Sequence, residues 1–108
     1  MATAQEFAES KLDAFKNRMR ISTTDAGEIE NLKTMLGASY IAILRLVGIK
    51  DNPDESDIEL IFERSRYVYN DALDEFLHNY QEDIRYAWLS HHLEEKSEET
   101  EKAEEVSS

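Results

Sequence analysis

Apolar side chains recur at helical pitch through residues 61–80, and this pattern constrains the fold more than any other feature of the sequence. One stripe of the segment holds Ile61, Ser65, Val68, Ala72 and Phe76, widened by Phe62, Tyr69 and Leu73. The opposite face holds Glu63, Arg66, Asn70, Asp74 and His78. Because Ser65 and Ala72 are small, a second helix can approach closely there and contact the rings on either side. The pattern predicts one long amphipathic helix that the rest of the chain covers.

The composition favours an all-α protein. The 108 residues include 3 glycines and 1 proline, so a sheet would have few turns to draw on. This length corresponds to a single domain with one hydrophobic core. We therefore predict a small bundle of three to four helices over residues 1–92, followed by a flexible acidic tail over residues 93–108.

Charge and cysteine content exclude several classes of function. A net charge of −12 repels phosphate backbones and anionic lipids, so free nucleic acid and membranes are poor ligands. With no cysteine the chain cannot form a disulfide or a thiolate zinc site, and a reducing compartment is the simplest expectation. The apolar stretch over residues 40–47 is too short to span a bilayer, and no secretion signal precedes it. We expect a soluble protein that is not exported by that route.

Capping signals mark the first helix. Thr3 and Glu6 can form a capping box, and the helix that they open is expected to end near Arg20. Its later part carries the only basic cluster, Lys11, Lys16, Arg18 and Arg20. These cations suit the negative end of a helix, and they could equally contact an acidic neighbouring subunit.

The second helix is the most apolar segment. Asp25 is its candidate N-cap, and Gly48 supplies the left-handed position at its end. Apolar residues between these points cover much of the circumference. We interpret this segment as the central core helix, although its second side could meet a neighbouring subunit.

A loop and a weakening of the apolar pattern mark the start and the end of the long helix. Ser56 and Glu59 can form a capping box that opens the long helix after an exposed loop containing Pro53. The apolar pattern loosens over residues 79–82, where we expect the helix to break. A short fourth helix would then carry Ile84, Ala87, Trp88 and His91.

Two histidine patterns resemble metal-binding motifs, but neither predicts a site. Glu75 and His78 have the Glu-x-x-His spacing of di-metal bundles, yet no second copy exists and His78 lies on the outer face. His91 and His92 are adjacent, so their side chains diverge by about 100° on a helix. No cofactor or metal is expected.

The sequence lacks the common signatures of catalysis. Without a cysteine nucleophile, a Gly-x-Ser-x-Gly elbow or a glycine-rich phosphate loop, the protein is predicted not to be an enzyme. Arg64 and Arg66 could form surface ion pairs or bridge subunits, while Trp88 could cap the core or anchor a partner. The candidate functional residues are therefore protein-interface residues: Arg18, Arg20, Arg64, Arg66, Arg85, Tyr86, Trp88 and His91.

Three segments carry a family resemblance. They are residues 15–21 (FKNRMRI), the apolar helix ending at Val47 and Gly48, and residues 59–76 (ELIFERSRYVYNDALDEF). In this order they resemble the head-tail connector proteins of long-tailed bacteriophages, also called adaptor or head-completion proteins. The most specific part is RYVYNDA, residues 66–72. The resemblance covers roughly residues 12–84 and excludes the tail.

The resemblance implies a structural role in the virion. Family members are small helical proteins that form a ring of about a dozen copies beneath the portal protein. The ring continues the DNA exit channel, and its far side receives a stopper or tail-completion protein. It implies synthesis in the host bacterial cytoplasm, a final location at the head-tail interface, and no catalytic residue. Tyr69, Ala72 and Phe76 match core positions, while residues 84–92 and the tail are expected to contact the portal.

The negative charge fits this role and also permits another. An acidic channel lining would repel DNA phosphates, so that the duplex slides without specific binding. The alternative is an acidic helical regulatory protein that sequesters a basic partner by mimicking phosphate charge. That protein would bind its partner one-to-one, with an affinity that falls as salt is added.

Overall fold

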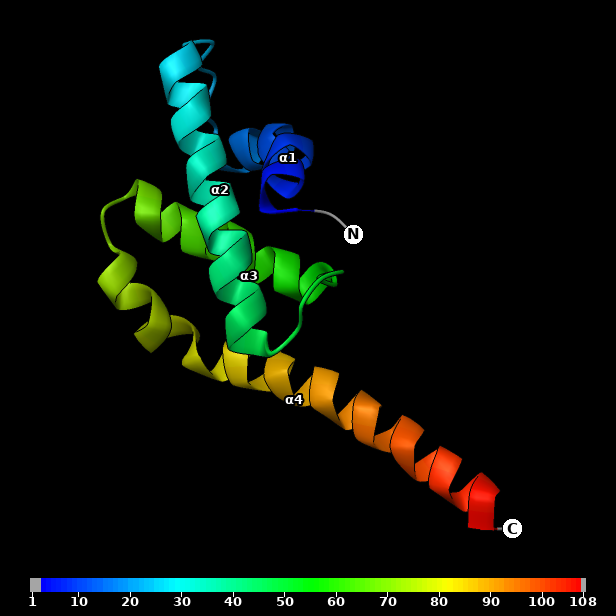
Figure 1. Cartoon of the computed structure of the whole chain (residues 1–108). Coiled ribbons are helices and arrows are strands. Elements are labelled where there is room, and N and C mark those ends of the chain that lie inside the picture. The colour runs from blue at the N-terminus through cyan, green and yellow to red at the C-terminus, as the bar shows by residue number, and fades with distance from the viewer. Residues whose placement is uncertain (1–2, 108) are drawn as a thin grey trace.

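The computed structural model of the protein is all-α, as the sequence predicts. It describes residues 3–107, and the side chains of residues 3–93. The helices are α1 (Ala4–Met19), α2 (Ala26–Val47), α3 (Glu55–Tyr69) and α4 (Leu73–Ser107), and the described residues contain no strand (Figure 1). Apart from Leu93, the predicted flexible tail lies outside the residues whose side chains are described.

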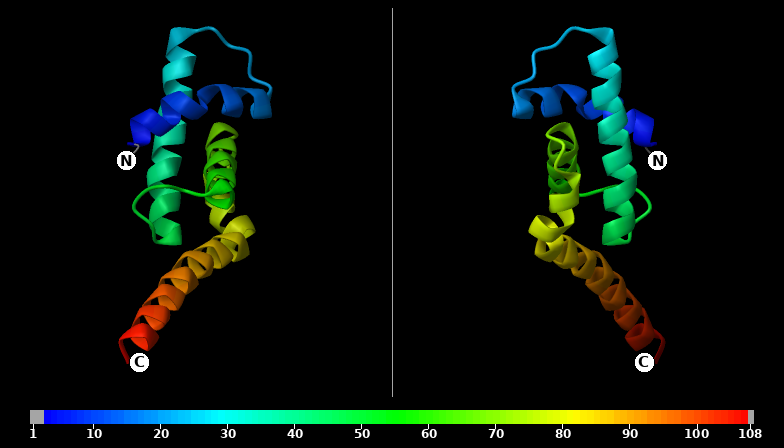
Figure 2. Two further views of the ribbon diagram at one scale, coloured as in Figure 1. Left: turned by 90° about the vertical axis from the view of Figure 1, so that its right-hand side faces the viewer. Right: turned by 90° about the vertical axis from the view of Figure 1, so that its left-hand side faces the viewer.

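Helix α2 is the centre of the bundle. The helices α1 and α3 cross it, and α4 leads away from its C-terminal end (Figures 1 and 2). One group of buried side chains lies around the C-terminal half of α2 and comprises Phe7, Tyr40, Ile43, Leu44, Val47, Leu60, Ile61, Phe76 and Ile84. A second lies around its N-terminal half and comprises Ala8, Phe15, Leu32, Leu36 and Phe62. Because α2 contributes to both groups, the prediction of a central core helix is confirmed.

The predicted ends of α1 and α2 are also confirmed. The hydroxyl of Thr3 accepts a hydrogen bond from the Glu6 amide at 3.1 Å, and Arg20 ends α1 with a left-handed φ of 58°. The carboxylate of Asp25 caps α2 by accepting from the Glu28 amide at 2.9 Å. Gly48 ends α2 with a φ of 75°, a conformation that glycine adopts without steric cost.

The prediction of one long helix through residue 80 is wrong, because the chain turns sharply after Tyr69. Asp71 adopts a left-handed φ of 59°, and the Ala72 amide donates to the Tyr67 carbonyl at 2.8 Å. Asp and Asn tolerate this conformation better than other residues with a Cβ atom, so the turn needs no glycine. The break expected over residues 79–82 is absent, since α4 continues through them.

This turn reassigns the residues of the predicted stripe. Tyr69 is 46% exposed and Ala72 is half-buried, so neither is fully buried, whereas Phe76 is 1% exposed. Glu63, predicted to face solvent, is 9% exposed because α1 and α4 cover it. Ser65 is buried against α2 as predicted, with its Oγ 2.9 Å from the Oγ of Ser39.

The capping box of α3 lies two residues earlier in the chain than predicted. Asp54, not Ser56, is the N-cap, because its carboxylate accepts from the Asp57 amide at 2.9 Å. The Asp57 carboxylate accepts from the Asp54 amide at 3.0 Å in return. This reciprocal pair satisfies two amides at the helix start. The Asp57 side chain is completely buried.

Candidate functional site

A charged network built around Glu63 joins three helices. Its Oε1 accepts from Arg18 of α1 at 2.6 Å, and its Oε2 accepts from Arg66 of α3 and from the Tyr80 hydroxyl of α4. Glu59 completes the network with a bidentate pair to the Arg18 guanidinium. Arg18 and Arg66, both predicted interface residues, are therefore already engaged within the chain.

The network changes the pKa values of its carboxylates. Burial alone raises the pKa of Glu63, but hydrogen bonds from Arg66, Arg18 and Tyr80 outweigh it, so the pKa is lowered overall. The hydrogen bond from Arg18 likewise lowers the pKa of Glu59. Both groups are thus held in the charged form, which stabilises the contact of α1 with α3.

Arg64 is placed differently. It is half-buried, and its Nη1 donates to the Ser39 hydroxyl at 3.1 Å. Burial lowers the pKa of Arg64. No carboxylate pairs with it among residues 3–93. This guanidinium keeps donors for a further partner.

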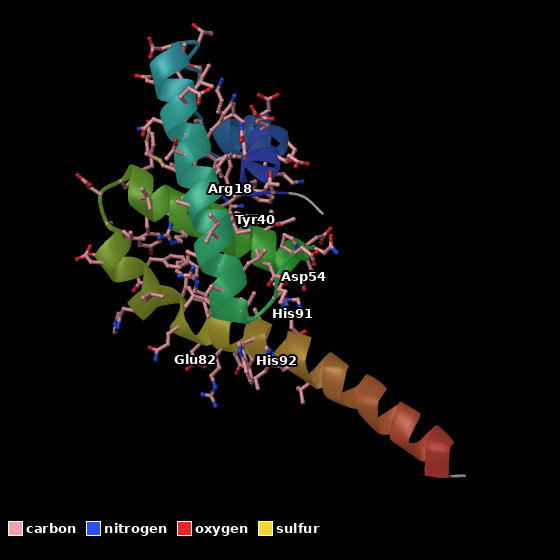
Figure 3. All side chains as sticks on the ribbon, viewed as in Figure 1. Arg18, Tyr40, Asp54, Glu82, His91 and His92 are labelled. Carbon is pink, nitrogen blue, oxygen red and sulfur yellow. The ribbon has the colours of Figure 1, made fainter. Side chains whose placement is uncertain are left out.

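The other predicted interface residues are spread over the molecule. Arg20 and Arg85 are exposed, and Tyr86 is 68% exposed. Trp88 is 42% exposed and stacks on His92, with ring centroids 3.7 Å apart, beside Gly48. His91 points to the start of α3, where its Nε2 lies 2.8 Å from Asp57 Oδ2 (Figure 3). The structure therefore does not gather these residues into one site.

Grooves between the helices mark the surface of the described residues. An acidic groove of about 490 Å³ lies between α3 and α4. Its lining includes Asp54, Glu59, Glu63, Asp83, Tyr80 and Tyr86. A groove of about 470 Å³ between α1 and α2 contains Ile41, and one of about 390 Å³ between α2 and α4 contains Leu46 and Leu77. Each groove presents at least one large exposed apolar or aromatic side chain.

The two residues of the Glu-x-x-His spacing lie at the surface. Glu75 and His78 are both exposed on α4, in agreement with the predicted outward direction of His78. The acidic grouping with metal-ligand geometry lies elsewhere, at Asp54, Asp57 and His91. Sequence reasoning missed it because Asp57 and His91 are 34 residues apart.

Comparison with protein-family models, curated proteins and solved structures found no match to this chain. Among the described residues, none of the helices combines the length and apolar character that crossing a membrane requires.

Proposed function

We propose that the chain is a structural subunit of a bacteriophage head-tail connector. In this role about a dozen copies form a ring between the portal and a stopper or tail-completion protein, and the ring extends the DNA exit channel. The resemblance of residues 12–84 to connector proteins motivates the proposal. The all-α bundle is compatible with it.

The observation that carries the proposal is the distribution of large exposed apolar side chains. Ile41 is 52% exposed, Leu46 37% and Leu77 56%, in two different grooves. Ile41 and Leu46 are five positions apart, which separates them by about 140° around α2. A ring subunit meets one neighbour with one face and the other neighbour with a different face, so it needs apolar contacts on two sides.

The half-buried Arg64 gives the proposal a second support. An arginine held against Ser39 is oriented, and its free donors match a carboxylate of an adjacent subunit. The net charge of −12 supplies many such carboxylates. We place Arg64 at the contact between subunits, and we place the excess acidic residues at the channel, where they repel DNA.

Electron microscopy of the protein mixed with the portal encoded nearest to it tests the proposal, together with light scattering of the protein alone. Rings that cap the portal, with a mainly acidic lumen, are the expected result. A stable monomer that ignores the portal contradicts the proposal. Portal-bound rings with a basic lumen would retain the connector role and reject the account of the channel charge.

The acidic groove favours one alternative function. Four carboxylates and two tyrosines line it. Glu59 and Glu63 are paired with arginines of the chain, so Asp54 and Asp83 are the carboxylates that a lysine or arginine side chain would bind there. An acidic regulatory protein that sequesters a basic partner would use this groove. Such binding would be one-to-one and would weaken steeply with salt, whereas ring assembly on the portal would not occur.

A further inference from the structure

A carboxylate at the start of α3 is buried with one of its oxygens unpaired. Asp57 is 0% exposed, and its Oδ2 accepts from the Asp54 amide at 3.0 Å and contacts His91 Nε2 at 2.8 Å. Its Oδ1 has no hydrogen-bond partner among the described residues. A buried carboxylate oxygen without a partner is costly, so this position calls for a counter-charge.

Two other ligand groups lie beside the Asp57 carboxylate. His91 Nε2 lies 3.8 Å from Asp54 Oδ2, and one ligand atom from each of Asp54, Asp57 and His91 lies within 4.8 Å of the others. Figure 3 shows Asp54 and His91 facing each other from the start of α3 and from α4. The cluster therefore brings two helices together at one polar site.

Two carboxylates meet at this point, and the side chain of Asp57 is completely buried. A cation bound at the cluster would offset the charge of both.

We propose that Asp54, Asp57 and His91 bind a divalent transition-metal cation of the Zn²⁺ type. One imidazole nitrogen and two carboxylate oxygens form a mixed set that suits zinc and its neighbours, whereas Mg²⁺ and Ca²⁺ prefer oxygen ligands alone. Ligands of a tetrahedral zinc ion lie about 3.3 Å apart, so side-chain shifts of roughly 1 Å would complete the site. Three protein ligands leave a fourth position for water.

The bound ion would fasten α4 to the start of α3. Without it the same groups hold α4 against the start of α3 through the hydrogen bond between His91 and Asp57. This inference concerns the fold of one chain, so it does not depend on the connector proposal.

Calorimetric titration of the full-length protein with Zn²⁺ after EDTA treatment tests the inference. We expect saturable binding of one equivalent and a rise in melting temperature, with no comparable effect of Mg²⁺. Asp57→Asn and His91→Gln should each lower the Zn²⁺ affinity by roughly tenfold or more. His78→Gln is the matched control, because it removes an exposed histidine of the same helix and should leave binding unchanged.

Two further measurements separate metal binding from a purely structural contact. Circular dichroism establishes that each variant is folded, and His91→Gln keeps a donor that can reach Asp57. In NMR spectra, Zn²⁺ should shift the ring resonances of His91 and not those of His78. Absence of binding to the wild-type chain overturns the proposal. A Zn²⁺ affinity that stays at the wild-type value in both Asp57→Asn and His91→Gln also overturns it, since the ion would then be held by other acidic residues.

Discussion

Glu63 shows how a single charged residue can be buried at little cost. Each of its oxygens accepts at least one hydrogen bond from a side chain, and these donors come from three helices. Two of the donors are arginines, so the contacts are charge-assisted. A carboxylate satisfied in this way stabilises the arrangement of α1, α3 and α4.

We predict that Arg18→Ala lowers the free energy of unfolding by about 1–2 kcal/mol. The variant removes the Arg18 bonds to both Glu59 and Glu63, and it leaves Glu63 with donors on one oxygen only. Urea unfolding followed by circular dichroism measures the change. Arg20→Ala is the control: Arg20 is exposed, so its loss should change stability by at most about 0.5 kcal/mol. Equal effects of the two variants would contradict the assignment.

The same network predicts a loss of stability in acid. The pKa values of Glu59 and Glu63 are lowered from an ordinary value of 4.5, so their contribution is complete above that pH. It is lost as the pH falls through their lower folded-state values. Burial raises the pKa of Asp57, so protonation of this group in acid favours the folded state. This effect is the same in the wild-type chain and in Arg18→Ala, and it cancels when the two are compared. Urea unfolding between about pH 6 and pH 3 should therefore show a shallower acid limb in Arg18→Ala than in the wild-type chain. Parallel curves would reject the prediction.

Sequence spacing could reveal only part of these contacts. The Arg66–Glu63 pair lies at i and i+3 on one helix. Helical spacing therefore allowed an ion pair of Arg66 within the chain to be predicted, as one alternative to a contact between subunits. The Arg18–Glu63 contact joins positions 45 residues apart. Such a pair depends on how α1 crosses the bundle, which no local pattern encodes. The same holds for Asp57 and His91.

At the scale of helices, the caps of α1 and α2 were predicted correctly, whereas the N-cap of α3 and the position of the break between α3 and α4 were not. Thr3, Asp25 and Gly48 mark ends that depend on local hydrogen bonds and backbone conformation, and they were placed correctly. The α3–α4 turn was missed because apolar residues keep helical spacing across it. Asn70 and Asp71 were its only local signal, since both residue types tolerate a left-handed backbone.

We predict that Gly48→Ala destabilises the junction of α2 with α4 by about 1–2 kcal/mol. Gly48 has a φ of 75°, and an added Cβ would lie 2.6 Å from His92 Cε1 and 3.1 Å from Trp88 Nε1. The stacked pair of rings must therefore move. Trp88 is the only tryptophan, so its fluorescence reports this movement directly, alongside thermal unfolding.

Gly37→Ala is the matched control for this variant. Gly37 lies within α2, and an added Cβ would lie 3.6 Å from the Ala4 carbonyl oxygen, an ordinary contact. Alanine should raise stability there by roughly 0.5–1 kcal/mol through helix propensity. Destabilisation by both variants would mean that α1 and α2 are packed too closely at Gly37, and an unchanged Trp88 emission in Gly48→Ala would contradict the proposed ring displacement.

At the scale of the whole molecule, the surface is better suited to protein contacts than the sequence alone indicated. The breadth of apolar residues on α2 left open whether its second side is buried in the core or meets another subunit. The side chains of α2 that face the core are buried, while Ile41 and Leu46 remain exposed in separate grooves. The direction in which each apolar side chain points depends on the crossing of α1 and α4, so periodicity could not assign it.

Ring assembly should depend on these exposed side chains, whereas the fold of one chain should not. We predict that Ile41→Ser and Leu77→Ser change the free energy of unfolding by at most about 1 kcal/mol, because both side chains are more than half exposed. Each variant should nevertheless prevent rings from forming on the portal, since one uncovered face is enough to leave a ring open.

Thr34→Ser is the control, because Thr34 lies in the Ile41 groove and serine keeps the hydroxyl that bonds the Glu30 carbonyl. Electron microscopy of each variant with the portal gives the result. Complete rings from both serine variants would place the subunit contacts elsewhere, and failure of Thr34→Ser would show that the assay responds to any change in that groove.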